Sequence, residues 1–318
     1  MLKKDITKKI PYHTAFVVNP AAGDGKAGLI WPGVEAFLKQ SGQSYRSYFT
    51  RRAGDASRLA ARAVFEGAEL VVAVGGDGTL REILNGLNLD KSILGVIPAG
   101  TGNGFVRSLD LPLKWKNALQ GLSEWEPRRI DIGRANDILF LNSAGIGLDG
   151  AVAEAAANKY KCLKGYLAFA AALVDQAANF SRFHCHIECN GLRFDEGQTL
   201  VALVANGRYY GGKLCIAPQA SIDDGFLDLC LIRKRSIPEL LILGARVAVR
   251  RHLSSKAFLK MQGHTFTLET SRRLPLQIDG DVTEATCVEV EIMPSALRVL
   301  APESKKLAPA FATIPGTG

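Results

Sequence analysis

The sequence predicts an α/β protein in two parts, a parallel-sheet domain followed by a β-sandwich-like domain. From residue 12 to about 125, apolar runs alternate with helix-compatible segments, which is the pattern of a parallel sheet covered on both faces. Beyond residue 128 the sequence changes to short segments of alternating polarity. The 318 residues, 47% of them hydrophobic, are enough for two packed cores. We therefore expect domains at 1–128 and 129–304, and a flexible tail at 305–318.

Hydrophobic periodicity and turn residues place the expected elements along the chain. In the first part, strands are expected at 14–18, 44–50, 71–74 and 93–97, and helices at 27–41, 53–67 and 80–87. In the second part, strands are expected at 129–132, 139–144, 183–188, 199–205, 227–232 and 287–292. One helical segment, 151–175, interrupts these strands, and residues 237–249 form a strongly apolar, helix-compatible stretch.

The most informative feature is the turn Gly-Gly-Asp-Gly-Thr at 75–79, directly after an apolar strand. Its glycines allow backbone N–H groups to approach an anion, and the helix that follows directs its positive end at the same place. Asp77 would be repelled by phosphate unless it meets a metal, a ribose hydroxyl or a backbone N–H. The turn therefore indicates nucleotide handling, although the same residues also suit an ordinary turn.

A second polar loop, Pro-Ala-Gly-Thr-Gly-Asn-Gly-Phe at 98–105, follows the next apolar strand. If the two strands are parallel neighbours, both loops lie at the carboxyl edge of one sheet and form two walls of one site. The loop after the first strand is not a Walker A motif, because Pro20 replaces a required glycine and Ala27 a required Ser or Thr. A G-x-G-x-x-G dinucleotide fingerprint is also absent after that strand.

Charge and composition narrow the expected partners and location. The net charge is +8, but basic and aromatic residues do not interleave, so we do not expect nucleic acid as a partner. The charged amino terminus lacks the apolar region of a secretion signal, and the longest apolar run, 166–174, is shorter than the ~20 residues of a membrane span. We therefore expect a cytoplasmic protein. The basic region 233–260 either rests on anionic lipid at the inner membrane face or surrounds an ordinary core helix.

The six cysteines are irregularly spaced and are expected to be buried free thiols. The run 184–189, His-Cys-His-Ile-Glu-Cys, has the composition of a zinc site. Its apolar and polar residues alternate, however, and in a strand residues four apart lie ~13 Å apart, too far for one tetrahedral metal. We interpret it as a strand with one buried face.

Five motifs together resemble the diacylglycerol kinase catalytic-domain family. They are Asn19-Pro20, the turns at 75–79 and 98–103, Asp-Asp-Gly-Phe-Leu-Asp at 223–228, and Asp-Gly-Asp at 279–281. This family includes bacterial diacylglycerol and related lipid kinases, sphingosine kinases and ceramide kinases. The resemblance extends over about residues 12 to 302 and implies an NAD kinase/diacylglycerol kinase-like fold. It further implies ATP-dependent phosphorylation of a lipid hydroxyl, most simply that of diacylglycerol.

The resemblance also implies roles for individual residues. The residues that it assigns to ATP are Asn19, Thr50, Gly75, Gly76, Asp77, Gly78, Thr79, Glu82, Gly100, Thr101, Gly102 and Asn103. It makes Asp224 a ligand of Mg²⁺, together with backbone oxygens near Ser221 and Phe226, in keeping with the preference of Mg²⁺ for hard oxygen ligands. Asp281 becomes the general base for the attacking hydroxyl. Asp149 either joins the magnesium network or lines the lipid cleft.

Two residues depart from the family pattern. Gly104 replaces an aspartate that usually follows the asparagine of the second loop, and Asp281 replaces a glutamate, which withdraws the carboxylate by about one methylene. Four alternatives stay open: a sphingoid-base or ceramide kinase, a soluble NAD kinase-type enzyme, a non-catalytic nucleotide-binding protein and, least favoured, a Rossmann-type oxidoreductase. The expected partners are a lipid with a free hydroxyl and a transient membrane surface, with a homodimer as an open alternative.

Overall fold

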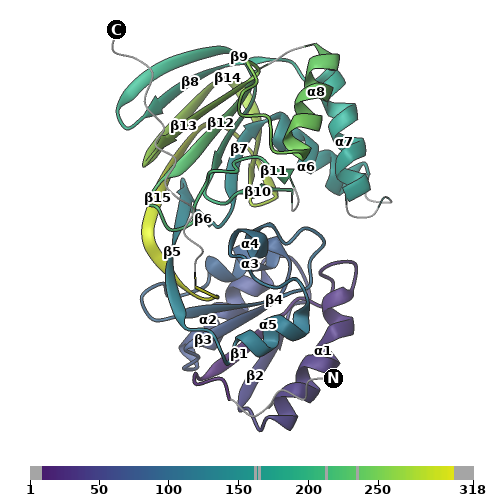
Figure 1. Cartoon of the computed structure of the whole chain (residues 1–318), viewed down its shortest axis with the longest axis vertical. Helices are drawn as coiled ribbons and strands as arrows, with labels where there is room; N and C mark the ends of the chain where they lie inside the picture. The colour runs from purple at the N-terminus through teal and green to yellow at the C-terminus, as the bar shows by residue number, and fades with distance from the viewer. Residues whose placement is uncertain (1–8, 161–162, 164–165, 212–213, 234–235, 304–318) are drawn as a thin grey trace.

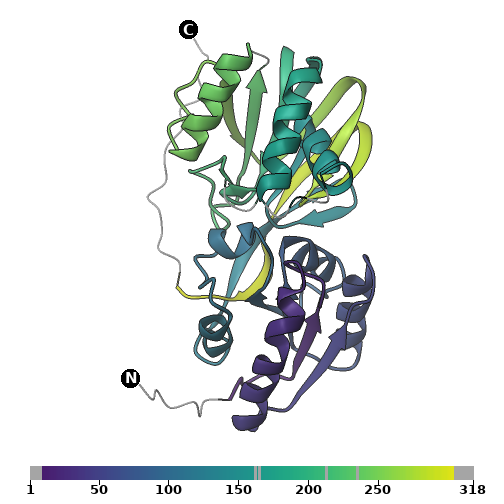
Figure 2. The same cartoon turned by 90° about the vertical axis from the view of Figure 1, so that its right-hand side faces the viewer.

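A computed structural model describes residues 9–160, 163, 166–211, 214–233 and 236–303. The expected tail at 305–318 lies outside these residues. Two parts are stacked along the long axis, and the chain crosses between them on one side through β5 (Pro127–Ala135) and β15 (Asp281–Leu300), as Figure 1 shows. The perpendicular view in Figure 2 shows the same division, with the helices of each part outside its strands.

The first part contains four parallel strands and five helices. Its strands are β1 (Thr14–Val18), β2 (Tyr45–Phe49), β3 (Leu70–Gly75) and β4 (Ile93–Pro98), paired in the order β4-β3-β1-β2. Its helices are α1 (Lys26–Gln40), α2 (Asp55–Phe65), α3 (Asp77–Leu84), α4 (Gly104–Ser108) and α5 (Trp115–Gly121). The parallel pairing expected for this part is therefore present, whereas α4 and α5 were not predicted.

The near-continuous apolar runs of these strands reflect burial on both faces. Alternate residues of β3 enter different cores: Val71 and Ala73 pack with α2 and α3, whereas Leu70 and Val72 pack with α1 and α5. Every residue of β3 is buried. The β-strand period of two is thus satisfied by two cores, which is the arrangement that the alternation of strands and helices predicts.

The second part is mainly antiparallel. Its larger strands, besides β5 and β15, are β6 (Ile138–Phe140), β7 (Ser143–Gly147), β8 (Phe183–Cys189), β9 (Leu192–Ala205), β12 (Leu227–Arg233), β13 (Phe258–Gly263) and β14 (Thr265–Ile278). Two short strands, β10 (Tyr209–Tyr210) and β11 (Leu214–Cys215), pair with each other in a separate sheet. The helices α6 (Leu148–Asn158), α7 (Tyr166–Asn179) and α8 (Ile237–Ala248) lie together beside the strands (Figure 1).

The strands of both parts belong to one mixed 13-stranded sheet, so a purely parallel sheet set apart from a second domain is not what the chain forms. The connection is β15, which is 20 residues long. Its first half pairs antiparallel with β14, and its end pairs parallel with β4 through Arg298 and Val299. Between these two pairings, the register of β15 with β5 shifts at a bulge between Met293 and Leu297. Such a bulge bends the strand that carries it.

Several expected boundaries differ from the structure; the strand expected at 287–292, for example, is part of the much longer β15, and the one expected at 199–205 is part of β9. The expected strand 139–144 is divided into β6 and β7, because the backbone N–H groups of Leu141 and Asn142 donate to the Asp279 carboxylate instead of to a ladder. The expected helix 151–175 is divided into α6, which ends at Asn158, and α7, which begins at Tyr166; residues 161, 162, 164 and 165 between them lie outside the described residues. Helix α3 begins at Asp77, three residues before its expected start.

The strand prediction for the histidine- and cysteine-rich run is confirmed. In β8, Phe183, Cys185, Ile187 and Cys189 are buried and His184 and His186 are exposed. Among the described residues, no group of three or more His, Cys, Asp or Glu side chains is placed to hold a metal ion. Within the same residues, no helix has the length and apolar character needed to cross a membrane.

Candidate nucleotide and acceptor site

The first part contains an open pocket of about 490 Å³ at the carboxyl ends of its strands. Eight of the residues expected to contact ATP line it: Asn19, Thr50, Gly76, Gly78, Thr79, Glu82, Gly100 and Thr101. The other four, Gly75, Asp77, Gly102 and Asn103, are not part of the lining. Two neighbouring strand ends therefore contribute to one pocket, as their predicted parallel pairing requires.

The two glycine turns touch each other through their backbones. A Cβ atom added to Gly100 would lie 2.4 Å from the Gly76 Cα, and one added to Gly76 would lie 2.9 Å from the Gly100 Cα. The N–H groups of Ala99 and Gly100 also donate to the Gly75 carbonyl oxygen, at 2.8 and 3.1 Å. No side chain fits between the turns, so their contact excludes every residue except glycine at these positions.

Helix α3 starts at the pocket, with Gly76 as its N-cap and Gly78 and Thr79 in its first turn. The first N–H groups of a helix have no partner inside the helix, so they are available to an anion. The Thr79 hydroxyl accepts a hydrogen bond of 3.0 Å from the Asn19 side chain. That bond joins the loop after β1 to the turn after β3 and fixes two walls of the pocket relative to each other.

Asp77 and Asn103 stabilise the turns from behind the pocket. The two carboxylate oxygens of Asp77 accept the N–H groups of Gly104 and Phe105, at 2.9 and 3.0 Å, and so cap α4. Asn103, at φ +54°, bonds the Gly100 N–H and carbonyl through its own amide, at 3.1 and 2.8 Å. Of the three partners considered for Asp77, the structure contains backbone N–H groups. Gly104 supplies one of them.

Three charged residues line the pocket: Glu82, Arg51 and Arg52. Glu82 accepts the Ala56 N–H at 3.0 Å and thereby holds the start of α2 at the pocket edge. Asp55 accepts the Arg51 and Arg52 N–H groups, which shapes the loop after β2, and these backbone hydrogen bonds lower its carboxyl pKa. Sequence reasoning missed both arginines, because neither is part of a glycine turn.

The Asp-Gly-Asp hairpin at 279–281 places its two carboxylates in different surroundings. Asp279 is buried and accepts the N–H groups of Leu141, Asn142 and Ser143, at 2.6, 2.9 and 3.0 Å. Burial raises its pKa to about 6 although these hydrogen bonds oppose the shift. Asp281 is exposed and forms an ion pair with Arg81 of α3. The structure thus joins the hairpin to the helix that starts at this pocket.

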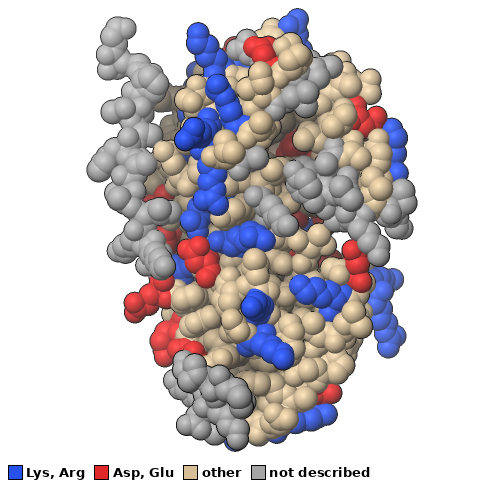
Figure 3. Space-filling view, turned by 45° about the vertical axis from the view of Figure 1, so that its right-hand side comes forward, with Lys and Arg blue, Asp and Glu red and all other residues tan. Residues whose placement is uncertain are grey.

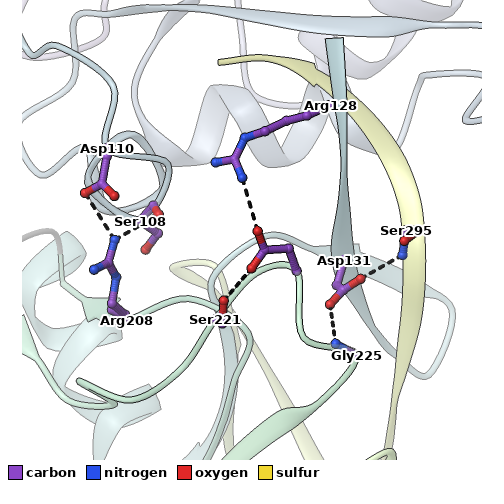
Figure 4. A network of polar contacts seen from close by, with 9 residues as sticks. Ser108, Asp110, Arg128, Asp131, Arg208, Ser221, Gly225 and Ser295 are labelled. Atoms are coloured by element: carbon purple, nitrogen blue, oxygen red, sulfur yellow. Dashed lines mark hydrogen bonds and ion pairs between the residues drawn. The ribbon is translucent and has the colours of Figure 1, made fainter. Parts of the chain in front are cut away.

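The loop at 221–226, expected to hold magnesium, does not line this pocket. Asp223 accepts from the Ser221 hydroxyl and pairs with Arg128. Figure 4 shows that buried Asp131 accepts the N–H groups of Gly225 and Ser295, both at 2.7 Å. The same figure shows Arg208 bonded to Asp110 and the Ser108 carbonyl, a second link between the two parts. Sequence reasoning missed Asp131.

The chemistry of this loop fits one hard cation. The pKa of Asp224 is raised to about 6, mainly by burial; the Phe226 N–H opposes the shift, and the charges of Asp228, Asp131 and Asp223 add to it. A cation would offset both the repulsion and the loss of hydration. Because the described residues offer no cluster of three acidic or imidazole ligands, such a cation would need backbone oxygens and water as its other ligands.

The family is shown by comparison with known proteins. Residues 13–135 match the model of the diacylglycerol kinase catalytic domain, and residues 142–301 match that of the YegS C-terminal NAD kinase beta sandwich-like domain. A diacylglycerol kinase of Bacillus subtilis (strain 168) is 30% identical over 247 residues, 77% of this chain and 81% of its own length. A Pseudomonas putida protein named probable lipid kinase YegS-like is 32% identical over 275 residues, 85% of this chain and 90% of its own.

Solved structures show the same fold. A diacylglycerol kinase structure from Bacillus anthracis str. Sterne superposes with a TM-score of 0.67 and 21% sequence identity, covering 92% of this chain and 98% of its own. These matches define the class: an ATP-dependent lipid kinase with an α/β first part and a β-sandwich-like second part. The chain belongs to the diacylglycerol kinase catalytic-domain family.

Proposed function

We propose that the protein transfers the γ-phosphoryl group of ATP to the free hydroxyl of diacylglycerol. The observation that supports this most directly is the backbone contact of Gly76 with Gly100 at the start of α3, a helix that also carries the ion-pair partner of Asp281 from the second part. The backbone N–H groups of the turns can bind a polyphosphate, and the carboxylate of Asp281 can accept a proton from an alcohol. Diacylglycerol is favoured over a sphingoid base or ceramide because relatives carry its name, including that of Bacillus subtilis.

In this mechanism positioning and charge neutralisation dominate, since phosphoryl transfer requires little covalent chemistry from the protein. The N–H groups at the start of α3 and in the turn around Gly100 hold the phosphates. Asn19 and Thr79 hold the two loops in register. Asp281 accepts the proton of the lipid hydroxyl as its oxygen bonds to the γ-phosphorus and the bond to the β-phosphate oxygen breaks. ADP and the lipid phosphate are the products.

We assign Mg²⁺ to the loop that carries Asp224, with backbone oxygens of Ser221 and Phe226. A bound Mg²⁺ would offset part of the repulsion that Asp224 experiences from Asp228, Asp131 and Asp223, and so order the loop. Asp131 and Asp223 hold that loop against β15 and Arg128, which ties its order to the junction of the two parts. The parts that bind nucleotide and present Asp281 meet at this junction.

The test is transfer of radiolabelled phosphate from ATP to a lipid panel, with and without Mg²⁺. The panel contains diacylglycerol, monoacylglycerol, a sphingoid base and ceramide, and NAD is included as a soluble acceptor. We expect Mg²⁺-dependent labelling of diacylglycerol, and a loss of at least about 100-fold in kcat for Asp281→Asn, in the range attributed to general bases. Unchanged turnover in that variant would remove Asp281 from the mechanism; labelling of NAD alone would reassign the enzyme.

A lipid substrate also requires contact with a membrane surface, and we assign that contact to α8. Its outer stripe, defined here as Ile242, Arg246 and Val249, is exposed, with Ile242 55% and Val249 63% accessible. Leu243 and Val247, on another face of the helix, are buried in the core. Figure 3, which brings this side of the molecule forward, shows Lys and Arg side chains in a band on its upper part and across its middle. Exposed aliphatic residues beside basic ones suit an anionic bilayer.

A further inference from the structure

We propose that Arg81 is a positioning residue for the phosphoryl transfer: it holds the Asp281 carboxylate at a fixed place relative to the nucleotide pocket. This inference rests on the proposed function and concerns a contact between residues 200 positions apart in the chain. Arg81 belongs to α3, whose first turn lines the nucleotide pocket. Asp281 begins β15 in the second part. One ion pair therefore joins the nucleotide side of the site to the acceptor side.

The two partners differ in how firmly the structure holds them. The Arg81 side chain is only 13% exposed, whereas that of Asp281 is 64% exposed. Burial lowers the pKa of Arg81, and the nearby carboxylates of Asp279 and Glu82 oppose that shift. Arg81 is thus a largely buried cation on a packed helix. Asp281 has no comparable packing, so the arginine supplies the constraint on its position.

The ion pair leaves one carboxylate oxygen of Asp281 available to the substrate hydroxyl. The guanidinium contacts Oδ2 of Asp281, so Oδ1 can accept the hydrogen of a substrate hydroxyl. Arg81 also offsets the repulsion among Asp279, Asp281 and the incoming phosphates, which would otherwise push the exposed carboxylate toward solvent. A displacement of about 1 Å in a reacting group can lower a rate by about 100-fold. Loss of Arg81 should therefore affect turnover much more than nucleotide binding.

The chain provides a matched control on the same helix. Asn85, one turn after Arg81, also joins α3 to the second part: its side-chain amide donates to the Leu139 carbonyl at 2.9 Å and accepts the Leu139 N–H at 3.0 Å. The same amide also donates to the Arg81 backbone carbonyl at 2.9 Å, which does not involve the guanidinium. Asn85→Ala therefore weakens the contact between the parts and the end of α3 but removes no contact of the Arg81 guanidinium or of Asp281. A role of Arg81 in docking alone would be reproduced by this variant.

The experiment compares Arg81→Met, Arg81→Lys and Asn85→Ala in the radiolabelled transfer assay, with ATP affinity measured by titration. We expect Arg81→Met to lower kcat about 10- to 100-fold with the KM for ATP within about twofold, Arg81→Lys to recover part of the loss, and Asn85→Ala to retain kcat. In an Asp281→Asn background, Arg81→Met should change kcat by less than about twofold, because the group it positions is already absent.

Three results would overturn the proposal: an unchanged kcat in Arg81→Met, an equal loss in Asn85→Ala, or a full additional loss in the Asp281→Asn background. Arg81→Lys preserves the charge, so it keeps the comparison informative if the methionine variant does not fold. Failure of the proposed function has a separate signature. In that case the unmodified protein labels no lipid, or Asp281→Asn is fully active. A normal effect of Asp281→Asn with a fully active Arg81→Met contradicts only the positioning role.

Discussion

At the residue scale, the proposed nucleotide pocket depends on the absence of side chains from two of its glycines. Gly76 and Gly100 are in backbone contact, and neither requires a positive φ angle, so close approach alone explains their identity. Asn103 instead requires the left-handed region, which asparagine tolerates better than most residues. Gly76 and Gly100 thus fit the pocket because they have no side chain, and Asn103 fits because it tolerates a positive φ angle.

We expect Gly100→Ala to separate the two turns, because its Cβ would lie 2.4 Å from the Gly76 Cα and 2.9 Å from the Asn103 Oδ1. ATP affinity should fall at least about 10-fold and the free energy of unfolding by about 1–3 kcal/mol, as in overpacked sites. Titration calorimetry and urea denaturation measure the two effects. The control is Gly244→Ala in α8, where a Cβ meets no atom within 4 Å and the affinity should be unchanged. Wild-type affinity in Gly100→Ala would show that the turns tolerate separation.

From the buried carboxyl group of Asp149 we predict a specific dependence of the free energy of unfolding on pH. It is buried at the start of α6, and burial raises its pKa to about 7, while contacts with Gly150 and Gln277 oppose the shift. The folded chain keeps this proton up to about pH 7, whereas the unfolded chain loses it near the ordinary value of 3.8. The group's contribution to the free energy of unfolding should therefore fall as pH rises from about 4 to 7.

Asp149→Asn should remove that dependence. At pH 8 the variant should be more stable than the wild type by about 1–3 kcal/mol, and near pH 4 the difference should be small. Chemical denaturation at several pH values measures this, with Asp137→Asn, an exposed position, as the control. A variant that is less stable at pH 8 would mean that the Asp149 carboxylate is stabilised by its surroundings in the charged form.

At the scale of elements, α8 shows how one helix can serve both the core and a surface. It begins with a capping box formed by Ser236 and Glu239, and it places Leu243 and Val247 in the core. Its fold is therefore specified without the outer stripe of Ile242, Arg246 and Val249. Those residues are free to be selected for an external contact.

We expect Ile242→Glu to weaken binding to vesicles that contain phosphatidylglycerol by about 3- to 10-fold, because it replaces an inserted aliphatic group with a charge that the anionic surface repels. Vesicle sedimentation measures the binding. Leu29→Glu is the matched control, since Leu29 is an 81% exposed aliphatic residue on α1 of the first part. Equal losses in both variants, or none in Ile242→Glu, would place the membrane contact elsewhere.

At the scale of the whole molecule, the two parts are joined by continuous strands and not by a linker. Leu297 and Val299 of β15 are buried in the core of the first part together with Ile130 of β5. The other end of β15 packs in the second part through Val288 and Val290. Separation of the parts would therefore expose apolar surface of both cores.

This arrangement predicts one cooperative unfolding transition for the full chain, although it has two parts. A fragment that ends at residue 135 lacks β15 and should not fold to a stable state, because β4 loses its pairing with Arg298 and Val299. Scanning calorimetry of the full chain and circular dichroism of the fragment test this. Two resolved transitions, or a cooperatively folded fragment, would show that the first part is independent.

Most of the local structure of the first part could be predicted from the sequence, because its strands are buried on both faces and its helices repeat a clear period. The glycines that directly follow two apolar strands predicted the turns at 75–79 and 98–103. The sequence also indicated the hairpin at 279–281. It did not separate the roles of its two aspartates, since burial of Asp279 and exposure of Asp281 depend on Leu141, Asn142 and Ser143, more than 130 residues away.

By itself, the sequence determined the broad class of fold, the two glycine turns and the family, since these depend on short motifs and periodicity. Only the tertiary structure decided that both parts share one sheet, that Asp77 bonds backbone N–H groups, and that Arg81 meets Asp281. The physical reason is range. A turn or a helix is encoded by neighbouring residues, whereas an ion pair across 200 residues exists only after the long strand β15 has brought the hairpin to α3.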